Sequence, residues 1–404
     1  MPGSKLNIYP SRERSRSVVL FLLAVASTLV AGLLIGISKL SAQNGFYLDS
    51  NLAAQIGLHP FLMVYGAIGG LLLAEKLEMM NSFKVARSLS ISMLIIPSFI
   101  GGIAIFSVGF ITSIAFLKFT GAVLVTISAL LFMWFMVSRK IGGNNDAKFI
   151  MGAALLAFAL SPVEETLHSA TESPGVALLM LSFPIIYVLG ERIELGQMRG
   201  IPGIWIGLMK ILSVLGPVSL FIGNLVYRGI VENMLIDAGL ASLSGMALIS
   251  LYHDPAIRIS KVNRKLQSYM RLGIRSSYAW LILGIILYAL QVNVSRGFMD
   301  AATHSIALGF LGSFIISHSP VIFPLILKIR VDTEKVTKLP LYAMNASVLL
   351  RVVGDIARRV AYGYGVISFV SEWVLIIAIV LFLANIIKIR VNTAGLPWWG
   401  TESR

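Results

Sequence analysis

Residues 17–38, SVVLFLLAVASTLVAGLLIGIS, contain no charged side chain. A helix of this length crosses a hydrocarbon core of about 30 Å. Similar runs recur along the whole chain of 404 residues, of which 57% are hydrophobic and only 13% charged. Soluble domains carry roughly 25% charged residues. The mean hydropathy of +0.85 agrees with this contrast. The sequence therefore predicts an all-α, polytopic membrane protein rather than a soluble enzyme.

The hydrophobic pattern predicts about twelve transmembrane helices in a single domain over residues 17–387. Residues 1–16 and 388–404 are expected to be cytoplasmic segments. The apolar part of the first span is longer than the core of a typical signal peptide, which favours a retained anchor. The fifth and sixth spans are short, which suggests a small tilt or a re-entrant turn. The expected spans are 17–38, 53–74, 89–108, 119–138, 148–163, 175–190, 204–226, 233–252, 271–292, 300–317, 339–357 and 363–387.

The basic residues predict the orientation of the chain. Lys and Arg number 33 against 19 Asp and Glu, for a net charge of +14. With the N-terminus inside, most of the 33 fall on cytoplasmic loops, as the positive-inside rule requires. Only six fall in outer loops, namely Lys39, Lys118, Arg228, Arg296, Arg358 and Arg359. We expect a multi-pass protein of the cell membrane with both termini cytoplasmic. Its basic excess then indicates a lipid bilayer as partner and requires no nucleic acid.

The content of cysteine and histidine limits the possible metal sites. The chain has no cysteine and five histidines. Disulfides, Cys-ligated zinc, iron–sulfur clusters and covalently attached haem are thereby excluded. A metal or cofactor would have to rest on His, Met, carboxylate or backbone oxygen.

Two histidines are expected at one depth on different helices. His59 lies about 9 Å, and His304 about 6 Å, below the outer ends of their spans at 1.5 Å per residue. An imidazole in the membrane is costly without a partner. A b-type haem held between the two neutral rings would satisfy both. The alternative is that each ring hydrogen-bonds separately to a neighbouring helix.

The adjacent pair Arg358 and Arg359 stands on an outer face that is otherwise poor in positive charge. Haem propionates are anions that suit bidentate arginine contacts at this level. The pair is therefore a candidate for holding the propionates of a haem on His59 and His304. The alternative is a helix C-terminus stabilised by arginine, which is common.

Four more ionisable residues lie within predicted spans. Arg351 and Asp355 are four residues apart and share a helical face. Such a pair locks helices together or belongs to a proton path. Lys210 and Glu372 have no evident partner in the sequence, so each is a functional candidate that could also snorkel or pair with the other.

Two further histidines are weaker metal candidates. His168 follows Glu164 and Glu165 at a spacing that can bind a divalent ion, although such a set is more often a solvated helix end. His318 lies near the inner end of its span, about 21 Å along a helix from His304. The segment 317–320, with Pro320 and then Pro324, predicts a break or kink, so His318 serves a second inner site or caps broken backbone.

Part of the sequence resembles haem–copper oxidase subunit I. The run Leu58-His59-Pro60-Phe61-Leu62-Met63 is similar to the His-Gly-x-x-Met start of the second helix in that family. The family uses this histidine as an axial ligand of its low-spin haem. Arg358 and Arg359 resemble its propionate-binding arginine pair, and the span count agrees.

The second half resembles NnrS proteins, which are haem- and copper-containing membrane proteins linked to nitric oxide stress. Residues 273–283 are similar to their Gly-Tyr-x-Trp-Leu segment, and residues 301–309 to their His-Ala-Leu-Thr-x-Gly helix. Residues 304–310 and 318–324 further resemble uncharacterised prokaryotic members of the same superfamily.

The resemblance implies a bundle like that of oxidase subunit I, with His59 and His304 as haem ligands and a possible copper. Oxidases carry further histidines on the sixth and seventh helices, and a second one beside that on the tenth. This chain has none there. The resemblance therefore implies a redox or nitric-oxide-related haem protein, with a possible redox partner or other membrane subunits, and not a full oxygen-reducing oxidase. An ion- or proton-coupled transporter and a structural subunit of a membrane complex remain as alternatives.

Overall fold

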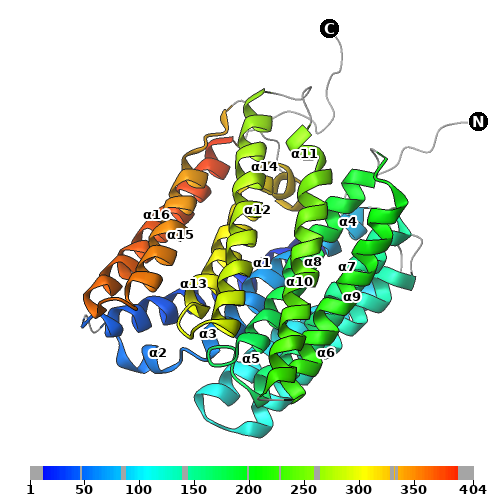
Figure 1. Cartoon of the computed structure of the whole chain (residues 1–404). Coiled ribbons are helices and arrows are strands. Elements are labelled where there is room, and N and C mark those ends of the chain that lie inside the picture. The colour runs from blue at the N-terminus through cyan, green and yellow to red at the C-terminus, as the bar shows by residue number, and fades with distance from the viewer. Residues whose placement is uncertain are drawn as a thin grey trace, which may run out of the picture.

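The computed structural model describes residues 12–45, 48–82, 88–138, 144–197, 200–226, 229–258, 264–327, 332 and 335–389. All regular elements in these ranges are helices (Figure 1). They are α1 (Arg12–Gln43), α2 (Ser50–Ala54), α3 (Leu58–Phe61), η1 (Leu62–Gly69), α4 (Gly70–Ser82), α5 (Ser88–Ile111), α6 (Ala115–Ser138), α7 (Asn145–Leu167), α8 (Pro174–Gln197), α9 (Gly203–Val226), α10 (Ile230–His253), α11 (Pro255–Arg258), α12 (Arg264–Asn293), α13 (Met299–His304), η2 (Ser305–Gly312), α14 (Ser313–Leu327), α15 (Leu339–Ala357), η4 (Tyr362–Tyr364) and α16 (Gly365–Ile389).

Twelve helices in the described ranges are long and apolar enough to span a membrane, which confirms the polytopic helical prediction. The prediction of two short spans was wrong, because the fifth runs Asn145–Leu167 over 23 residues and the sixth Pro174–Gln197 over 24. The sixth helix continues past its charged residues because these residues form ion pairs. In the sixth span, Glu191 pairs with Lys76 and Arg192 with Asp254. The predicted segments 1–16 and 388–404 lie almost wholly outside the described residues, as does Arg228, one of the six basic residues expected in outer loops.

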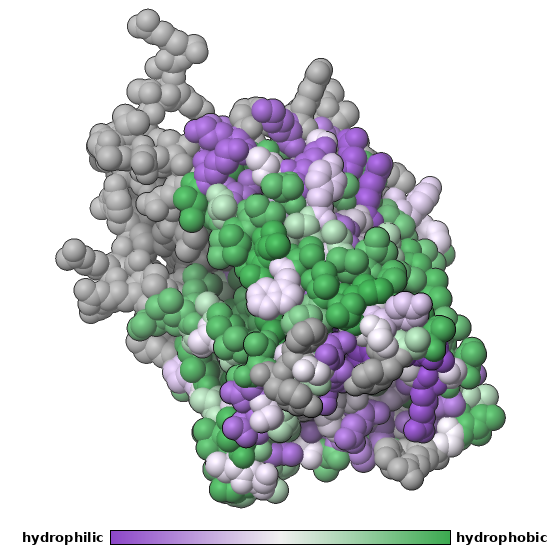
Figure 2. Space-filling model, turned by 90° about the vertical axis from the view of Figure 1, so that its left-hand side faces the viewer, coloured by the Kyte–Doolittle hydropathy of each residue, from purple (hydrophilic) through white to green (hydrophobic). Residues whose placement is uncertain are grey.

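The surface of the bundle carries a hydrophobic belt. Figure 2 shows one face on which hydrophobic residues form a band between two hydrophilic ends. Large apolar side chains are exposed along the outer helices, for example Leu23 on α1 at 60% and Val380 on α16 at 58%. Because water would penalise such a belt, the surface fits a lipid bilayer.

Helix α8 lies at the centre of the molecule, and 94% of the residues in its 18-residue apolar stretch are buried. It packs against α7, α9, α10 and η1. Stacked rings of Tyr65, Phe158 and Phe183 join η1, α7 and α8, with successive ring centroids 5.3 and 4.3 Å apart. This packing fixes η1, and with it the start of the second span, against the core.

Two membrane-spanning helices contain π-helical stretches, and each stretch follows a histidine. His59 lies three residues before the first residue of η1, and His304 is the residue directly before η2. Short π-helical segments are rare and occur frequently at functional sites. We call the end of the bundle that carries α2 and both histidines the α2 end, and the other the opposite end.

Of the predicted break or kink near His318, the break was wrong, because α14 continues through Pro320 and Pro324. Proline lacks the N–H that would bond to the carbonyl four residues earlier. Here that carbonyl belongs to Ile316, and it accepts hydrogen bonds from the Tyr269 hydroxyl at 2.8 Å and the Ser319 hydroxyl at 2.7 Å. These replacement donors satisfy the backbone and let the helix continue.

Candidate functional site

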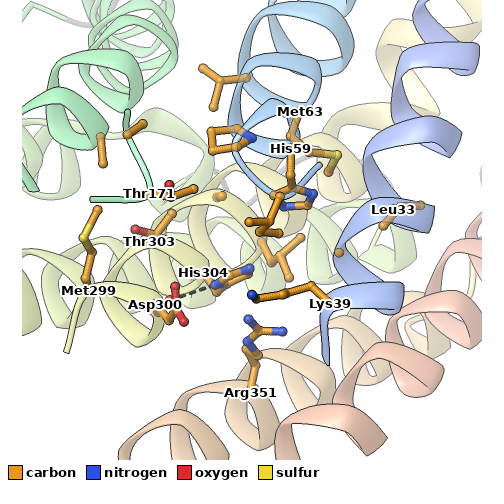
Figure 3. A pocket seen from close by; sticks show the side chains of 18 of the residues that line it. Leu33, Lys39, His59, Met63, Thr171, Met299, Asp300, Thr303, His304 and Arg351 are labelled. Carbon is orange, nitrogen blue, oxygen red and sulfur yellow. Dashed lines mark hydrogen bonds between the residues drawn. The ribbon is translucent and has the colours of Figure 1, made fainter. Parts of the chain in front are cut away.

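A cavity of about 330 Å³ lies at the α2 end, within the range typical of small-molecule pockets. Its walls come from α1, α3, η1, α8, α13, η2, α15 and α16. Both His59 and His304 line it (Figure 3). The structure thus brings together the two histidines that the sequence placed at one depth. Apolar side chains form most of the remaining wall, including Met63, Val64, Leu181 and Leu308.

The His59 ring is held from α1. Its Nδ1 lies 2.7 Å from the carbonyl oxygen of Gly32. Because a carbonyl only accepts, Nδ1 carries the proton, and in the neutral ring Nε2 keeps its lone pair. Gly36, one turn further along α1, leaves room for the ring, since a Cβ there would lie 3.1 Å from the ring carbon Cε1. The close approach of α1 therefore sets the orientation of His59.

The His304 ring is held in the same way by its own helix. Its Nδ1 donates to the carbonyl oxygen of Asp300 at 2.8 Å, drawn as a dashed line in Figure 3. Neither His59 nor His304 has a hydrogen-bond partner at Nε2 among the described residues. An Nδ1–H bound to a carbonyl is the usual support of a metal-ligating imidazole, since it fixes the tautomer and the orientation of the ring. The cavity thus holds two oriented imidazoles whose second nitrogens are available to a ligand.

One wall of the cavity carries a buried ion-pair network. Arg351 donates to Asp355 at 2.8 Å and, across the helix interface, to Glu372 on α16 at 2.7 Å. The predicted pairing of Arg351 with Asp355 is therefore confirmed, and the arginine also ties α15 to α16. The suggested pairing of Lys210 with Glu372 was wrong, because Lys210 instead pairs with Asp146 on α7 at 2.7 Å. Only Arg351 and Glu372 of this group line the cavity.

Arg358 and Arg359 border a second hollow that shares Thr171, Met299 and Asp300 with the main cavity. Arg358 is the C-terminal cap residue of α15. Its side chain donates to Gln43 at 2.8 Å and, at 3.5 Å, to Asp355. Arg359 donates to Ser295, and its guanidinium lies 4.0 Å from the centre of the Phe298 ring. The pair therefore stands beside the cavity, already engaged by protein groups.

His318 lies at the opposite end, within a saturated network. Its Nδ1 donates to the Phe314 carbonyl at 3.0 Å, and its Nε2 accepts from Arg192 at 3.1 Å. Arginine has only donors, so the lone pair that a metal would need is already taken. Arg192 in turn makes a two-pronged ion pair with Asp254, which also accepts from the Tyr278 hydroxyl at 3.1 Å.

The predicted trio of Glu164, Glu165 and His168 does not form a metal site. Among the described residues, no three His, Asp or Glu side chains group closely enough to hold an ion. Instead, Glu165 accepts from the backbone N–H of Ala170 at 2.7 Å, which ties the end of α7 to the following turn.

Sequence reasoning missed three residues that line the cavity. Lys39 was counted only as an outer-loop charge, but it points into the cavity (Figure 3). Gln43, four residues later on α1, links the cavity to Arg358. Asp300 supplies the carbonyl that orients His304. Its position four residues before a histidine is a signal that could have identified it.

A comparison with models of known protein families identifies the family of this chain. The chain belongs to the DUF8744 family. The family model, described as a domain of unknown function, matches residues 16–391. In this member of the DUF8744 family, the match covers both cavity histidines, the arginine pair and the network at the opposite end. No curated protein matches the chain at a significant level.

Proposed function

We propose that the protein is an integral membrane haem protein that holds one b-type haem between His59 and His304. The observation that carries this proposal is the state of the two rings. Each donates Nδ1–H to a backbone carbonyl and leaves Nε2 unbonded in one shared cavity. Two such imidazoles are the donor set of a six-coordinate haem iron.

The rest of the cavity fits the same ligand. Met63, Leu181 and Leu308 offer an apolar surface to a macrocycle, and the polar groups gather toward the α2 end. Arg358 and Arg359, beside the adjoining hollow, are within the region where anionic propionates would emerge. When bound, the haem would supply a one-electron redox change. The residues of the chain would fix its iron and exclude water from its apolar face.

The ligand set favours electron transfer or sensing, in redox or nitric-oxide-related chemistry, over oxygen reduction. A haem with two histidine ligands has no open position unless one ligand leaves. His318 is not part of this proposal, because its Nε2 already accepts from Arg192. The proposal also includes no copper, because the described residues contain no group of three or more His, Asp or Glu side chains that could hold a metal ion. A bound redox partner or further membrane subunits would supply or accept the electron.

We propose that the α2 end faces outward and that both termini are cytoplasmic, in the cell membrane. The asymmetry of basic residues supports this orientation. The α2 end includes Lys39, Lys118, Arg296, Arg358 and Arg359, whereas the loops at the opposite end contain most of the other basic residues. The haem would then lie near the outer face.

A spectrum tests the proposal. Purified protein should show b-type bands in a reduced-minus-oxidised difference spectrum, with about one haem per chain expected for a single bis-His site. His59→Ala and His304→Ala should each abolish the bands. His253→Ala, at the opposite end, should leave them unchanged. Haem retained in both ligand variants would refute the site, and a colourless preparation would refute the function.

The charged lining favours a second candidate, an ion- or proton-coupled transporter. Lys39, Asp300, Arg351 and Glu372 all line the cavity, and ionisable residues inside a membrane often mark a substrate path. A colourless protein that moves protons or a charged solute across vesicles, and loses this activity in Glu372→Gln, would support this function. A colourless protein without transport would point to a structural subunit of a membrane complex.

A further inference from the structure

Lys39 is a cation in the cavity that has no counter-ion among the residues the structure describes. It lies near the end of α1, is half-buried, and has no hydrogen bond or ion pair with any described residue. Figure 3 shows its ammonium group reaching into the space between His304 and Arg351. Every other charged side chain that lines the inner part of the cavity is paired, since Arg351 and Glu372 bond to each other at 2.7 Å.

The surroundings of Lys39 call for an anion. A half-buried ammonium that has no partner among the described residues is unfavourable, because it gives up part of its hydration without a compensating bond. The two buried carboxylates nearest to Arg351 are already engaged. Asp355 accepts from Arg351 and from the Ser368 hydroxyl, and Glu372 accepts from Arg351. Asp300 lines the cavity but is exposed and forms no ion pair with Lys39.

Lys39 also stands where a ligand would enter. Lys39 and Gln43 line both the main cavity and a shallow hollow formed with α2. The cavity therefore combines an apolar interior with a cationic mouth. Such a shape suits an amphiphilic ligand that has an apolar body and an anionic edge.

We propose that Lys39 binds a carboxylate of the ligand in this cavity. Resting on the proposed function, the ligand is haem and the carboxylate is one of its propionates. Arg358 and Arg359 are engaged with Gln43, Asp355, Ser295 and the Phe298 ring. Lys39 has no such partner among the described residues, so it gains the most from the contact. Lys39 is a binding residue of α1, on the same helix as the Gly32 carbonyl that holds His59.

Binding of haem and of haem dimethyl ester, in which both propionates are blocked, tests this contact. The full chain would be purified without haem and titrated with each compound, following the absorbance of the bis-His complex. Wild-type protein should bind haem at least about tenfold more tightly than the ester, as a charge-assisted hydrogen bond allows. Lys39→Met should lose most of this preference, whereas Lys39→Arg should keep it.

Lys118→Met is the matched control. Lys118 is a half-buried lysine at the same end of the bundle, beside the Phe110 ring and outside the cavity. The Lys118→Met variant should retain the wild-type preference for haem over the ester. Thermal unfolding of each variant without haem would show that it is folded. An undiminished preference in folded Lys39→Met would overturn the role of Lys39 alone. No preference in the wild type would overturn the propionate contacts of both Lys39 and the arginine pair, but not the histidine ligands. A wild-type protein that binds neither compound would overturn the proposed function as well.

Discussion

The histidines of the cavity at the α2 end and the histidine of the network at the opposite end differ in the hydrogen bonding of their rings. His59, His304 and His318 all donate Nδ1–H to a backbone carbonyl. They differ at the other nitrogen. Nε2 of His318 accepts from Arg192, whereas Nε2 of His59 and of His304 faces an open cavity. Burial of a histidine thus does not by itself indicate a ligand, and the state of the second ring nitrogen separates a structural ring from a candidate ligand.

The two regions also differ in how they use charge. Arg192 and Asp254 are 4% and 1% exposed and satisfy each other with two hydrogen bonds. The cavity instead leaves Lys39 without a partner in the described part of the chain. A saturated network stabilises the fold, while an unsaturated one is available to bind something. The comparison predicts that substitutions at the opposite end affect mainly stability and those at the cavity mainly binding.

The largest loss of stability is expected for Asp254→Ala. It leaves the Arg192 charge buried and unpaired, which costs about 3–5 kcal/mol. Unfolding followed in detergent with increasing denaturant would measure the loss. Asp237→Ala, on the same helix α10, removes a carboxylate bonded only to the exposed amide of Asn293, and should cost under about 1 kcal/mol. Equal losses in the two variants would contradict the stabilising role of the network.

A smaller loss is expected for His318→Leu. The change keeps an apolar side chain beside Phe314 but removes the acceptor for Arg192. Leaving one buried donor without its partner costs about 1–3 kcal/mol. The haem content of the folded variant, measured by difference spectroscopy, should equal that of the wild type. A folded variant without haem would place the haem at the opposite end.

The smallest effect is expected for Gly36→Ala. The new Cβ would lie 3.1 Å from Cε1 and 3.3 Å from Nδ1 of His59, whose ring is tethered to Gly32. The ring must shift by a few tenths of an ångström, and a misplaced ligand should weaken haem binding by about tenfold. Gly101→Ala is the control, because a Cβ there meets no atom within 4 Å. Haem titration of both proteins checks the prediction, and equal affinities would mean that the position of His59 does not control binding.

Much of the fold and part of the site could be predicted from sequence. A span in lipid must satisfy its own backbone, so hydrophobic length alone predicts a helix. The same helical rise placed His59 and His304 at one depth, and the four-residue spacing placed Arg351 on the face of Asp355. These predictions depend only on local geometry. The predicted lengths of the fifth and sixth spans were too short, because charged residues near their ends pair with other parts of the fold. Asp146 in the fifth span pairs with Lys210 on α9, and Arg192 in the sixth pairs with Asp254.

The sequence by itself determined the membrane class, the twelve spans, the depth of the paired histidines and the bond from Arg351 to Asp355. Only the tertiary structure decided that His59 and His304 share a cavity and that Nε2 of His318 is taken by Arg192. It also decided that Lys39 has no counter-ion within the described ranges. The physical reason is that helix formation depends on residues a few positions apart, whereas the satisfaction of a buried polar group depends on which helices pack beside it. Gly32 and His59, or Arg192 and Asp254, meet only when distant helices come into contact.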